Sequence, residues 1–403
     1  MRRTATALAS LLLSVATATF AATINVPADQ PTIQAGINAA SNGDTILVAP
    51  GKYLENINFM GKAITVVSSG GPRATVIDGG NVNSVVTFSS GETSTSVVRG
   101  FTIQNGNATA GIGEGGGIQV EGTSPTIVGN IITQNQACEG DGIGVGFGSP
   151  IIKNNLITKN SDSTCGGIGG AGIGIRGASS AQVLHNTISN NSTGSYGGGI
   201  ALWSGNAVRV ENNVINGNFA SSNGGGISMF NDASSVIVVQ NLIRDNASTT
   251  GNGIYWSNPP LALVNNTIAD STRAVGGATV WGDGFCCSVT IVNNVIVVTG
   301  GATNAFTCNY ADFPPQSFLF NDAFSKNGPP YGGMCSDQTG TNGNISADPL
   351  FVNATEGNYQ LTVLGYRRWR QFRSRSSEEG PRWQAPYRRW GCRRRCHHRH
   401  GSV

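Results

Sequence analysis

Acidic side chains at matched positions of neighbouring segments are the first candidates for chemistry. Glu114 and Glu139 each stand four residues before the isoleucine of a Gly-Ile step, with Asp141 and Asp162 close by in the sequence. If these segments lie on successive turns of one structure, the carboxylates lie about 4.8 Å apart, and they must bind a cation or raise a pKa. Oxygen ligands suit calcium, and paired carboxylates can hydrolyse glycosides. We therefore predict a calcium site at Glu114, Glu139, Asp141 and Asp162, with the first three as catalytic candidates; solvated turn residues are the alternative.

A second group of side chains could bind carbohydrate. Counting three residues past the isoleucine of successive Gly-Ile steps reaches Arg176, Trp203 and Phe230, and Trp256 and Trp281 occupy neighbouring positions. Aromatic rings that face outward from adjacent turns provide a surface on which sugar rings can stack. We predict that these five residues form such a surface. Packing of the rings under loops is the alternative, because aromatic side chains often cover apolar surface.

Cysteine usage bears on both redox compartment and metal binding. Six cysteines precede the C-terminal tail, namely Cys138, Cys165, Cys286, Cys287, Cys308 and Cys335. In an exported protein they favour disulfides, and no Cys-x2-Cys pair with matched histidines indicates zinc. We predict a Cys138–Cys165 bridge between successive corner loops, and a bond from Cys286 or Cys287 to Cys308. The one histidine before the tail, His185, lies inside a repeat and is expected to be structural.

An internal repeat must position all of these residues. Seven segments read Asn, an aliphatic residue or Thr, Ile, two variable residues and then usually Asn, at intervals of 25 to 31 residues. The first asparagines are Asn130, Asn155, Asn186, Asn213, Asn241, Asn266 and Asn294. The second asparagines are Asn135, Asn160, Asn191, Asn218 and Asn246, followed by Ser271 and Thr299. Gly-Ile steps precede the first six copies, at Ile118, Ile143, Ile173, Ile200, Ile227 and Ile254.

Each repeat predicts two or three short strands that coil into a solenoid. Runs such as Ile200–Leu202 and Val208–Val210 alternate in side-chain type, which indicates strands with one side facing inward. No helical segment separates them, so βαβ crossovers are excluded and the strands must turn at tight corners. Glycine and asparagine both tolerate the left-handed backbone of such corners. Stacked asparagine amides can hydrogen-bond from turn to turn, so we expect the seven first asparagines to form a structural ladder.

The repeat resembles right-handed parallel β-helix proteins of the pectin-lyase-like superfamily, in an uncharacterised secreted bacterial branch. Residues 24–80 resemble the opening segment of that family, and Pro31–Ala40 reads as a short amphipathic helix with Ile33 and Ile37 on one face. Such a helix caps the open end of the solenoid, and Thr45–Val48 is expected to begin the first turn. The resemblance therefore implies an all-β, single-stranded right-handed parallel β-helix with an N-terminal capping helix.

The catalytic motifs of known relatives are missing. Polygalacturonase-like members carry Asn-Thr-Asp, Asp-Asp, Gly-His-Gly and Arg-Ile-Lys, whereas this chain has Asn186-Thr187-Ile188 and Leu184-His185. Lyases of the superfamily commonly use calcium and a basic residue, and no lysine or arginine here stands in a recognisable lyase motif. No catalytic residue can be carried over from the family.

The first 21 residues read as a secretory signal peptide. Met1-Arg2-Arg3 is followed by an apolar run from Ala5 to Phe20, with small residues at its end, and cleavage is expected after Ala21. The predicted organisation continues with a cap and first turns (22–80), β-helix repeats (81–310), a closing segment (311–363) and a basic tail (364–403). Apart from this leader no run of about 20 apolar residues exists, so a membrane-spanning bundle is excluded.

The basic tail distorts the net charge of +3. Residues up to Val363 include 13 basic and 20 acidic side chains, so this part carries −7 and has no basic footprint for nucleic acid. Asp348–Val352 and Asn358–Leu361 resemble the family's closing segment, which then continues Gly-Ser-Pro-Ala-Ile-Asp-Ala-Gly. A one-base shift in the back-translation from Leu364 restores Ser-Ala-Ile-Asp-Ala-Gly. We therefore expect 364–403 to be frameshifted and disordered; a basic arm for anionic surfaces is the alternative.

These observations predict a secreted, monomeric β-helix protein that binds extracellular or cell-surface polysaccharide. A polysaccharide lyase or glycoside hydrolase is one alternative, and a structural, adhesin-type surface protein is another. Calcium is the one cofactor that the carboxylates suggest. The fold alone cannot separate these functions, because one fold hosts many of them.

Overall fold

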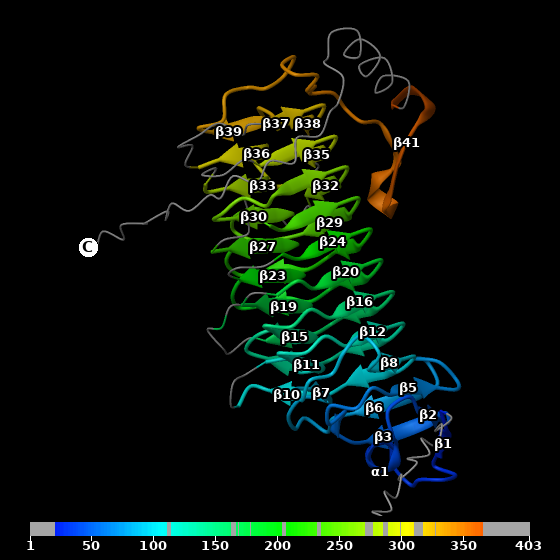
Figure 1. The fold of residues 1–403 in the computed structure, drawn as a ribbon. Helices are drawn as coiled ribbons and strands as arrows, with labels where there is room; N and C mark the ends of the chain where they lie inside the picture. The colour runs from blue at the N-terminus through cyan, green and yellow to red at the C-terminus, as the bar shows by residue number, and fades with distance from the viewer. Residues whose placement is uncertain are drawn as a thin grey trace, which may run out of the picture.

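Each turn of the chain consists of short strands joined by tight corners, and successive turns stack into a parallel β-helix (Figure 1). The computed structural model describes residues 21–110, 114–162, 167, 169–177, 179–203, 207–231, 235–270, 277–284, 289–298, 300–309, 317–326 and 328–365. The predicted signal peptide, nearly all of the predicted frameshifted tail, and Cys165, Cys286, Cys287, Ser271 and Thr299 lie outside these residues. Of Asp162 only the backbone is described. Within the described residues no helix is long and apolar enough to cross a membrane.

Three long parallel sheets form the walls of the solenoid. Sheet A contains β1 (Thr23–Val26), β2 (Thr45–Val48), β5 (Thr65–Ser68), β8 (Val97–Arg99), β12 (Thr126–Val128), β16 (Ile151–Lys153), β20 (Gln182–Leu184), β24 (Arg209–Glu211), β28 (Ile237–Val239), β31 (Ala262–Val264), β34 (Thr290–Val292) and β37 (Ser317–Leu319). Sheet B contains β3 (Gly51–Leu54), β6 (Thr75–Asp78), β9 (Thr102–Gln104), β13 (Ile131–Thr133), β17 (Leu156–Thr158), β21 (Thr187–Ser189), β25 (Val214–Asn216), β29 (Leu242–Asn246), β32 (Thr267–Asp270), β35 (Val295–Val298) and β38 (Asp322–Ser325). Sheet C contains β4 (Ile57–Asn58), β7 (Val86–Phe88), β11 (Ile118–Glu121), β15 (Ile143–Gly146), β19 (Ile173–Arg176), β23 (Ile200–Trp203), β27 (Ile227–Phe230), β30 (Ile254–Trp256), β33 (Ala278–Gly282), β36 (Asn304–Cys308) and β39 (Tyr331–Gly333).

Shorter elements complete the fold at its corners and its C-terminal end. They are β10 (Asn107–Ala108), β14 (Gln136–Ala137), β18 (Ser161–Asp162), β22 (Ser192–Thr193), β26 (Phe219–Ala220), β40 (Phe351–Asn353), the 3-10 helix η1 (Ala354–Glu356) and β41 (Asn358–Leu361). Strands β10 and β14 pair at one corner, and β18, β22 and β26 continue along it. The all-β solenoid predicted from the repeats is therefore confirmed.

Columns of aliphatic side chains fill the interior. The isoleucines of the Gly-Ile steps pair in register from β11 to β30, and all six are fully buried. Ile132, Ile157, Ile188 and Ile215 form a matching column on sheet B. Because the side-chain period of a strand is two, in-register stacking places every inward residue on its own kind and gives a continuous apolar core.

The predicted asparagine ladder is confirmed and is longer than expected. The Oδ1 atom of Asn213 accepts from the backbone N of Asn186 at 2.8 Å and from its Nδ2 at 3.1 Å, and Asn213 donates in the same way to Asn241. The same contacts run from Asn130 through Asn294 and then continue to Asn321 and Asn344, which the repeat search missed. A second ladder joins Asn135, Asn160, Asn191, Asn218 and Asn246. All of these side chains are buried.

The corner before each ladder asparagine has a left-handed backbone. His185 precedes Asn186 with φ of 56°, and Asn154, Asn212 and Gln240 hold the equivalent place on other turns. This geometry explains the structural role expected of His185: the residue turns the chain from sheet A into sheet B, and its backbone N donates to Glu211 O at 3.0 Å. Asparagine is favoured at such corners because it tolerates positive φ better than most residues.

The expected helical cap is present as α1 (Ile33–Ala39), with Ile33, Gly36 and Ile37 buried. Glu55 accepts from the backbone N of Ile33 and of Gln34, and Lys62 donates to three carbonyls at the other end of the helix. These charges complement the helix dipole. Gly36 allows close packing, because a Cβ there would lie 3.1 Å from Ile46 Cγ2. The first turn begins earlier than expected, since β1 precedes α1 and pairs with β2.

The C-terminal end is closed by a disulfide and by residues 334–361, which return along the stack and which we call the strap. Cys308 bonds to Cys335, so the expected pairing of Cys308 with Cys286 or Cys287 is wrong. Cys138 is also disulfide-bonded, but Cys165 lies outside the described residues and the predicted pair stays a prediction. Beyond β39 the chain reaches the hairpin β40–β41, which lies beside the strands of sheet B (Figure 1).

Candidate functional site

The outward side of sheet C carries the predicted carbohydrate-binding residues. Arg176, Trp203 and Phe230 occupy the same register position on β19, β23 and β27, as the count along the sequence implies. Trp256 does not join them: it pairs with Met229, packs against Phe306 and has no exposed surface. It lies two rather than three residues past its isoleucine, and this even offset places its side chain on the inward face with the isoleucine. Its expected place on an outer binding surface is therefore wrong.

Four rings contact one another on this side, and we call Tyr196, Trp203, Phe230 and Tyr255 the aromatic cluster. The Phe230 ring centroid lies 4.7 Å from that of Tyr196, 4.8 Å from that of Trp203 and 5.3 Å from that of Tyr255. These spacings are those of favourable tilted and edge-to-face ring pairs. The cluster is a single packed unit that extends over three turns of the solenoid.

Trp281 extends the aromatic surface by one turn. It pairs in register with Tyr255. Asp283 accepts from the Tyr255 hydroxyl at 2.5 Å and from Trp281 Nε1 at 2.6 Å. Burial, with this hydrogen bond next, raises the pKa of Tyr255 well above its usual range. The Asp283 carboxylate thus binds both the Tyr255 hydroxyl and the Trp281 indole N–H, and so fixes the orientation of the two rings.

Only part of the aromatic surface is open to solvent. Phe230 is 9% exposed and Tyr255 is 5% exposed, whereas Tyr196, Trp203 and Trp281 are partly exposed. Phe230 therefore supports the cluster from below, as the packing alternative foresaw. The three outer rings are the ones that could contact a sugar ring.

Two of the predicted acidic residues, Glu114 and Glu139, contact Arg176. We call Arg176, Glu114, Glu121 and Glu139 the Arg176 cluster. The Arg176 Nε atom forms an ion pair with Glu114 and lies 3.4 Å from Glu139 Oε2, and Nη2 lies 3.7 Å from Glu121 Oε2. The guanidinium also lies over the Phe147 ring, 5.6 Å from its centroid. Burial raises the pKa of Glu121.

Glycine on the strand between Glu121 and Arg176 makes this reach possible. The register aligns Glu121 on β11 with Gly146 on β15 and Arg176 on β19. A Cβ at Gly146 would lie 2.1 Å from Glu121 Oε2. Any larger residue at 146 would displace the Glu121 carboxylate, so the absence of a side chain there lets the arginine contact residues two turns away.

The stacking expected for Glu114 and Glu139 is present in the backbone, where the two residues form a parallel bridge. The Arg176 guanidinium, which the expectation did not include, lies among the carboxylates and offsets part of their charge. Asp141 accepts from the backbone N of Ala137 at 2.8 Å. Among the residues that the structure describes, no group of three or more His, Cys, Asp or Glu side chains could hold a metal ion. The calcium site therefore stays an untested prediction without a described ligand set.

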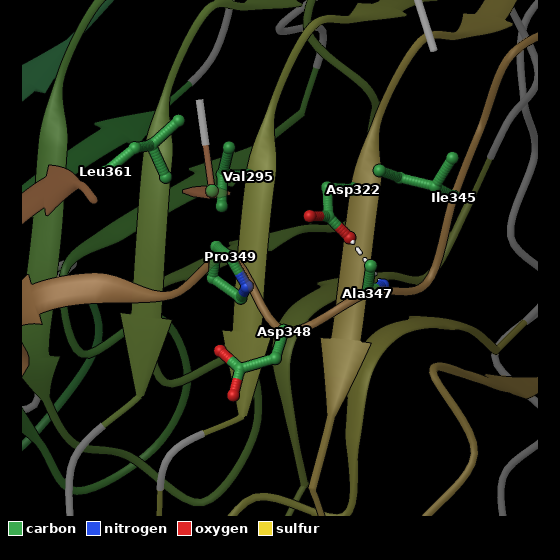
Figure 2. A pocket seen from close by; sticks show the side chains of 8 residues that line it. Val295, Asp322, Ile345, Ala347, Asp348, Pro349 and Leu361 are labelled. Atoms are coloured by element: carbon green, nitrogen blue, oxygen red, sulfur yellow. Dashed lines mark hydrogen bonds between the residues drawn. The ribbon is translucent and has the colours of Figure 1, made fainter. Parts of the chain in front are cut away.

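Two hollows lie near the C-terminal strap, and neither resembles the sheet C surface. One, shown in Figure 2, has a volume of about 10 Å³ and lies between β35, β38 and the strap. Asp322 points into it and accepts from the backbone N of Ala347 at 3.0 Å. It is large enough only for a water molecule. The other, of about 700 Å³, lies between sheet B and the hairpin and is lined by residues such as Gln240, Asn265 and Tyr359.

Sequence reasoning missed Glu121, Tyr196, Tyr255 and Asp283. Two of them could have been found by counting residues from the Gly-Ile isoleucines, as was done for the other candidates. Glu121 lies three residues past Ile118, which is the position of Arg176 and Trp203 on their own strands. Tyr196 lies four residues before Ile200, as Glu114 does before Ile118. No spacing in the sequence indicates the contact between Tyr255 and Asp283, because that contact depends on how one turn is shifted relative to the next.

Comparison with known proteins agrees with the architecture. Residues 161–296 match the family model described as "Right handed beta helix region". The A-module of the mannuronan C-5 epimerase AlgE6 from Azotobacter vinelandii is similar in structure, with 14% identity, a TM-score of 0.41, and coverage of 79% of this chain and 94% of that module. No curated protein matches the sequence. Together with the parallel register of all three sheets, the matched repeat region identifies this chain as a right-handed parallel β-helix repeat protein.

Proposed function

We propose that this protein is exported and binds extracellular or cell-surface polysaccharide along the outward side of sheet C. The observation that carries the proposal is a set of partly exposed rings on one surface, with Tyr196 and Trp203 on one turn and Trp281 three turns farther along. Phe230 and Tyr255 lie between them. Rings fixed by packing lose little conformational freedom when they bind a ligand, so they suit the stacking of sugar rings.

Polar groups beside the rings support this proposal. The Arg176 cluster adjoins Trp203 in register, and Asp283 adjoins Trp281. Sugar rings expose both apolar C–H faces and hydroxyl groups, and the two kinds of protein surface here complement them. A disulfide between Cys308 and Cys335 and an apolar leader at 5–20 support export.

Removal of one ring tests the proposal. Trp203→Ala should weaken retention on an immobilised polysaccharide panel at least tenfold, because it removes an exposed ring and loosens its packing with Phe230. The matched control is Phe219→Ala, which removes a ring that is 44% exposed on β26 and belongs to no pair in the aromatic cluster. Wild-type protein that is retained on no glycan, or Trp203→Ala retained like the control, would contradict the proposal.

A polysaccharide lyase or glycoside hydrolase is the second candidate, and Glu121 favours it. This carboxyl is about one third exposed, its pKa is raised by burial, and it lies beside a guanidinium. A raised carboxyl pKa suits a general acid. The same glycan panel with calcium should be scored for new reducing ends or unsaturated products, and Glu121→Gln, Glu114→Gln or Glu139→Gln should reduce any turnover. Binding without turnover disfavours this candidate; neither binding nor turnover favours a structural, adhesin-type role.

A further inference from the structure

The charge of the candidate binding surface distinguishes between classes of glycan. Among the described strands of sheet C, Arg176 is the one basic residue, and it contacts three carboxylates. A sugar carboxylate in this place would therefore meet more negative than positive charge. Uronate recognition requires a cation that is free to pair with the ligand, and this surface does not supply one.

Two glutamates of the Arg176 cluster are already paired with the arginine, so a cationic ligand is not required to balance their charge. Glu114 is 3% exposed and its Oε1 atom forms an ion pair with Arg176. Glu139 lies within ion-pair distance of the same guanidinium. Glu121 is the most exposed carboxylate of the Arg176 cluster, at about one third, and although its Oε2 atom is buried the group can accept a hydrogen bond from a hydroxyl.

Two files, that is, rows of residues that stack from turn to turn, run along this surface from its acidic region to its aromatic region. The file four residues before each Gly-Ile isoleucine runs from Glu114 and Glu139 to Tyr196. The file three residues after it runs from Glu121 through Arg176 to Trp203. In both files the first aromatic residue stands at the turn of β23. A chain of sugars stacked on Trp203 and running along the files would therefore pass Arg176 on the next turn and Glu121 two turns beyond it.

We propose that the surface selects uncharged polysaccharides over polyuronates, with the aromatic cluster stacking sugar rings and Glu121 accepting from sugar hydroxyls. This inference rests on the proposed function and names its substrate class. The chemistry is that of a hexose chain without carboxylate or amino groups.

Matched oligosaccharides test the charge selection. Binding of mannohexaose and hexamannuronate, and of cellohexaose and a glucosamine hexamer, should be measured by calorimetry on the full-length protein at low and moderate salt. The uncharged member of each pair should bind at least tenfold more tightly. Glu121→Gln should raise hexamannuronate affinity threefold or more relative to mannohexaose, because it removes a repelling charge and keeps the shape of the side chain.

A control variant separates this local effect from a change in total charge. Glu211→Gln removes a partly exposed carboxylate that pairs with Arg209 on sheet A, and it should leave the ratio of the two affinities unchanged. Tighter binding of hexamannuronate or of the glucosamine hexamer would overturn the inference and leave the proposed function intact. Failure of all four oligosaccharides and of the wider polysaccharide panel to bind would overturn both.

Discussion

At the scale of single residues, the asparagine side chain is what fastens one turn to the next. Its amide can accept two hydrogen bonds from the turn before and donate to the turn after, because one planar group carries both an acceptor oxygen and a donor nitrogen. Asn213 shows this: Oδ1 accepts from Asn186, and Nδ2 donates to Asn241 Oδ1 and to Val183 O. Because the site is buried, each atom left without a partner costs about 1–3 kcal/mol.

We predict that Asn213→Ala lowers the free energy of unfolding by about 3 kcal/mol, since several buried groups lose their partner. Asn213→Asp should be worse, because a carboxylate cannot donate to Asn241. Chemical denaturation measured by circular dichroism checks both. The control is Asn216→Ala on β25, the strand that follows Asn213, because the described contacts include no hydrogen bond of the Asn216 side chain. A loss at residue 213 no larger than that of the control would show that the ladder is not stabilising.

At the scale of strands and corners, the outward positions of sheet C differ in their distance from the backbone of the corner that precedes the adjacent strand. Gly144 on β15 and Ala201 on β23 share one register file. A Cβ on Gly144 would lie 2.4 Å from the backbone N of Gly115. The corner therefore lies too close to β15 for any side chain at residue 144, whereas a methyl group fits on β23. This difference explains why the file contains glycine at 144 and 174 and alanine at 201.

Gly144→Ala should destabilise the protein by about 1–3 kcal/mol, because the methyl group overpacks against backbone that cannot rotate away. It should also displace Glu114, which follows the same corner, and so loosen its ion pair with Arg176. Ala201→Gly is the opposite change at the equivalent site and should cost less than about 1 kcal/mol. Thermal unfolding of the two variants checks the difference, and equal losses would contradict it.

At the scale of the whole molecule, a solenoid must protect both of its ends. Helix α1 covers the N-terminal end, and the strap after β39 covers part of the C-terminal end (Figure 1). The strap places Ala347 against Asp322, a carboxyl that is 5% exposed (Figure 2). Burial, with a smaller contribution from Asp348, raises the pKa of Asp322 to about 7. The closure is therefore sensitive to pH.

The direction of this dependence follows from the protonation of the folded state. Between pH 4 and pH 7 the folded protein binds a proton at Asp322 that the unfolded chain releases, so the free energy of unfolding falls as pH rises through this range and levels off above pH 7. Asp322→Asn should remove that slope and stabilise the protein at pH 8 by roughly 4 kcal/mol, the size of a shift of about three pKa units. Unfolding free energies measured from pH 4.5 to pH 8 check this. A variant that keeps the slope of the wild type would contradict the assignment.

The sequence by itself determined the solenoid, the cap and the ladder. These features depend on periodicity: Asn186, Asn213 and Asn241 recur because each turn must present the same amide to its neighbour, so a count along the chain locates them. Ile33 and Ile37 locate the cap in the same way. Asn321 and Asn344 were missed because the residues around them depart from the repeat, although their amides stack like the others.

Only the tertiary structure decided what the chemically interesting residues contact. Glu114 and Glu139 stack as their spacing implies, yet their partner is Arg176, which comes from a later turn and reaches them across Gly146. Trp256 turned inward because its offset from the isoleucine is even, and Cys308 found Cys335 on the next turn. Periodicity specifies which residues share a file, whereas contacts between files depend on the offset of neighbouring turns and on the reach of each side chain, and no spacing along the chain encodes these.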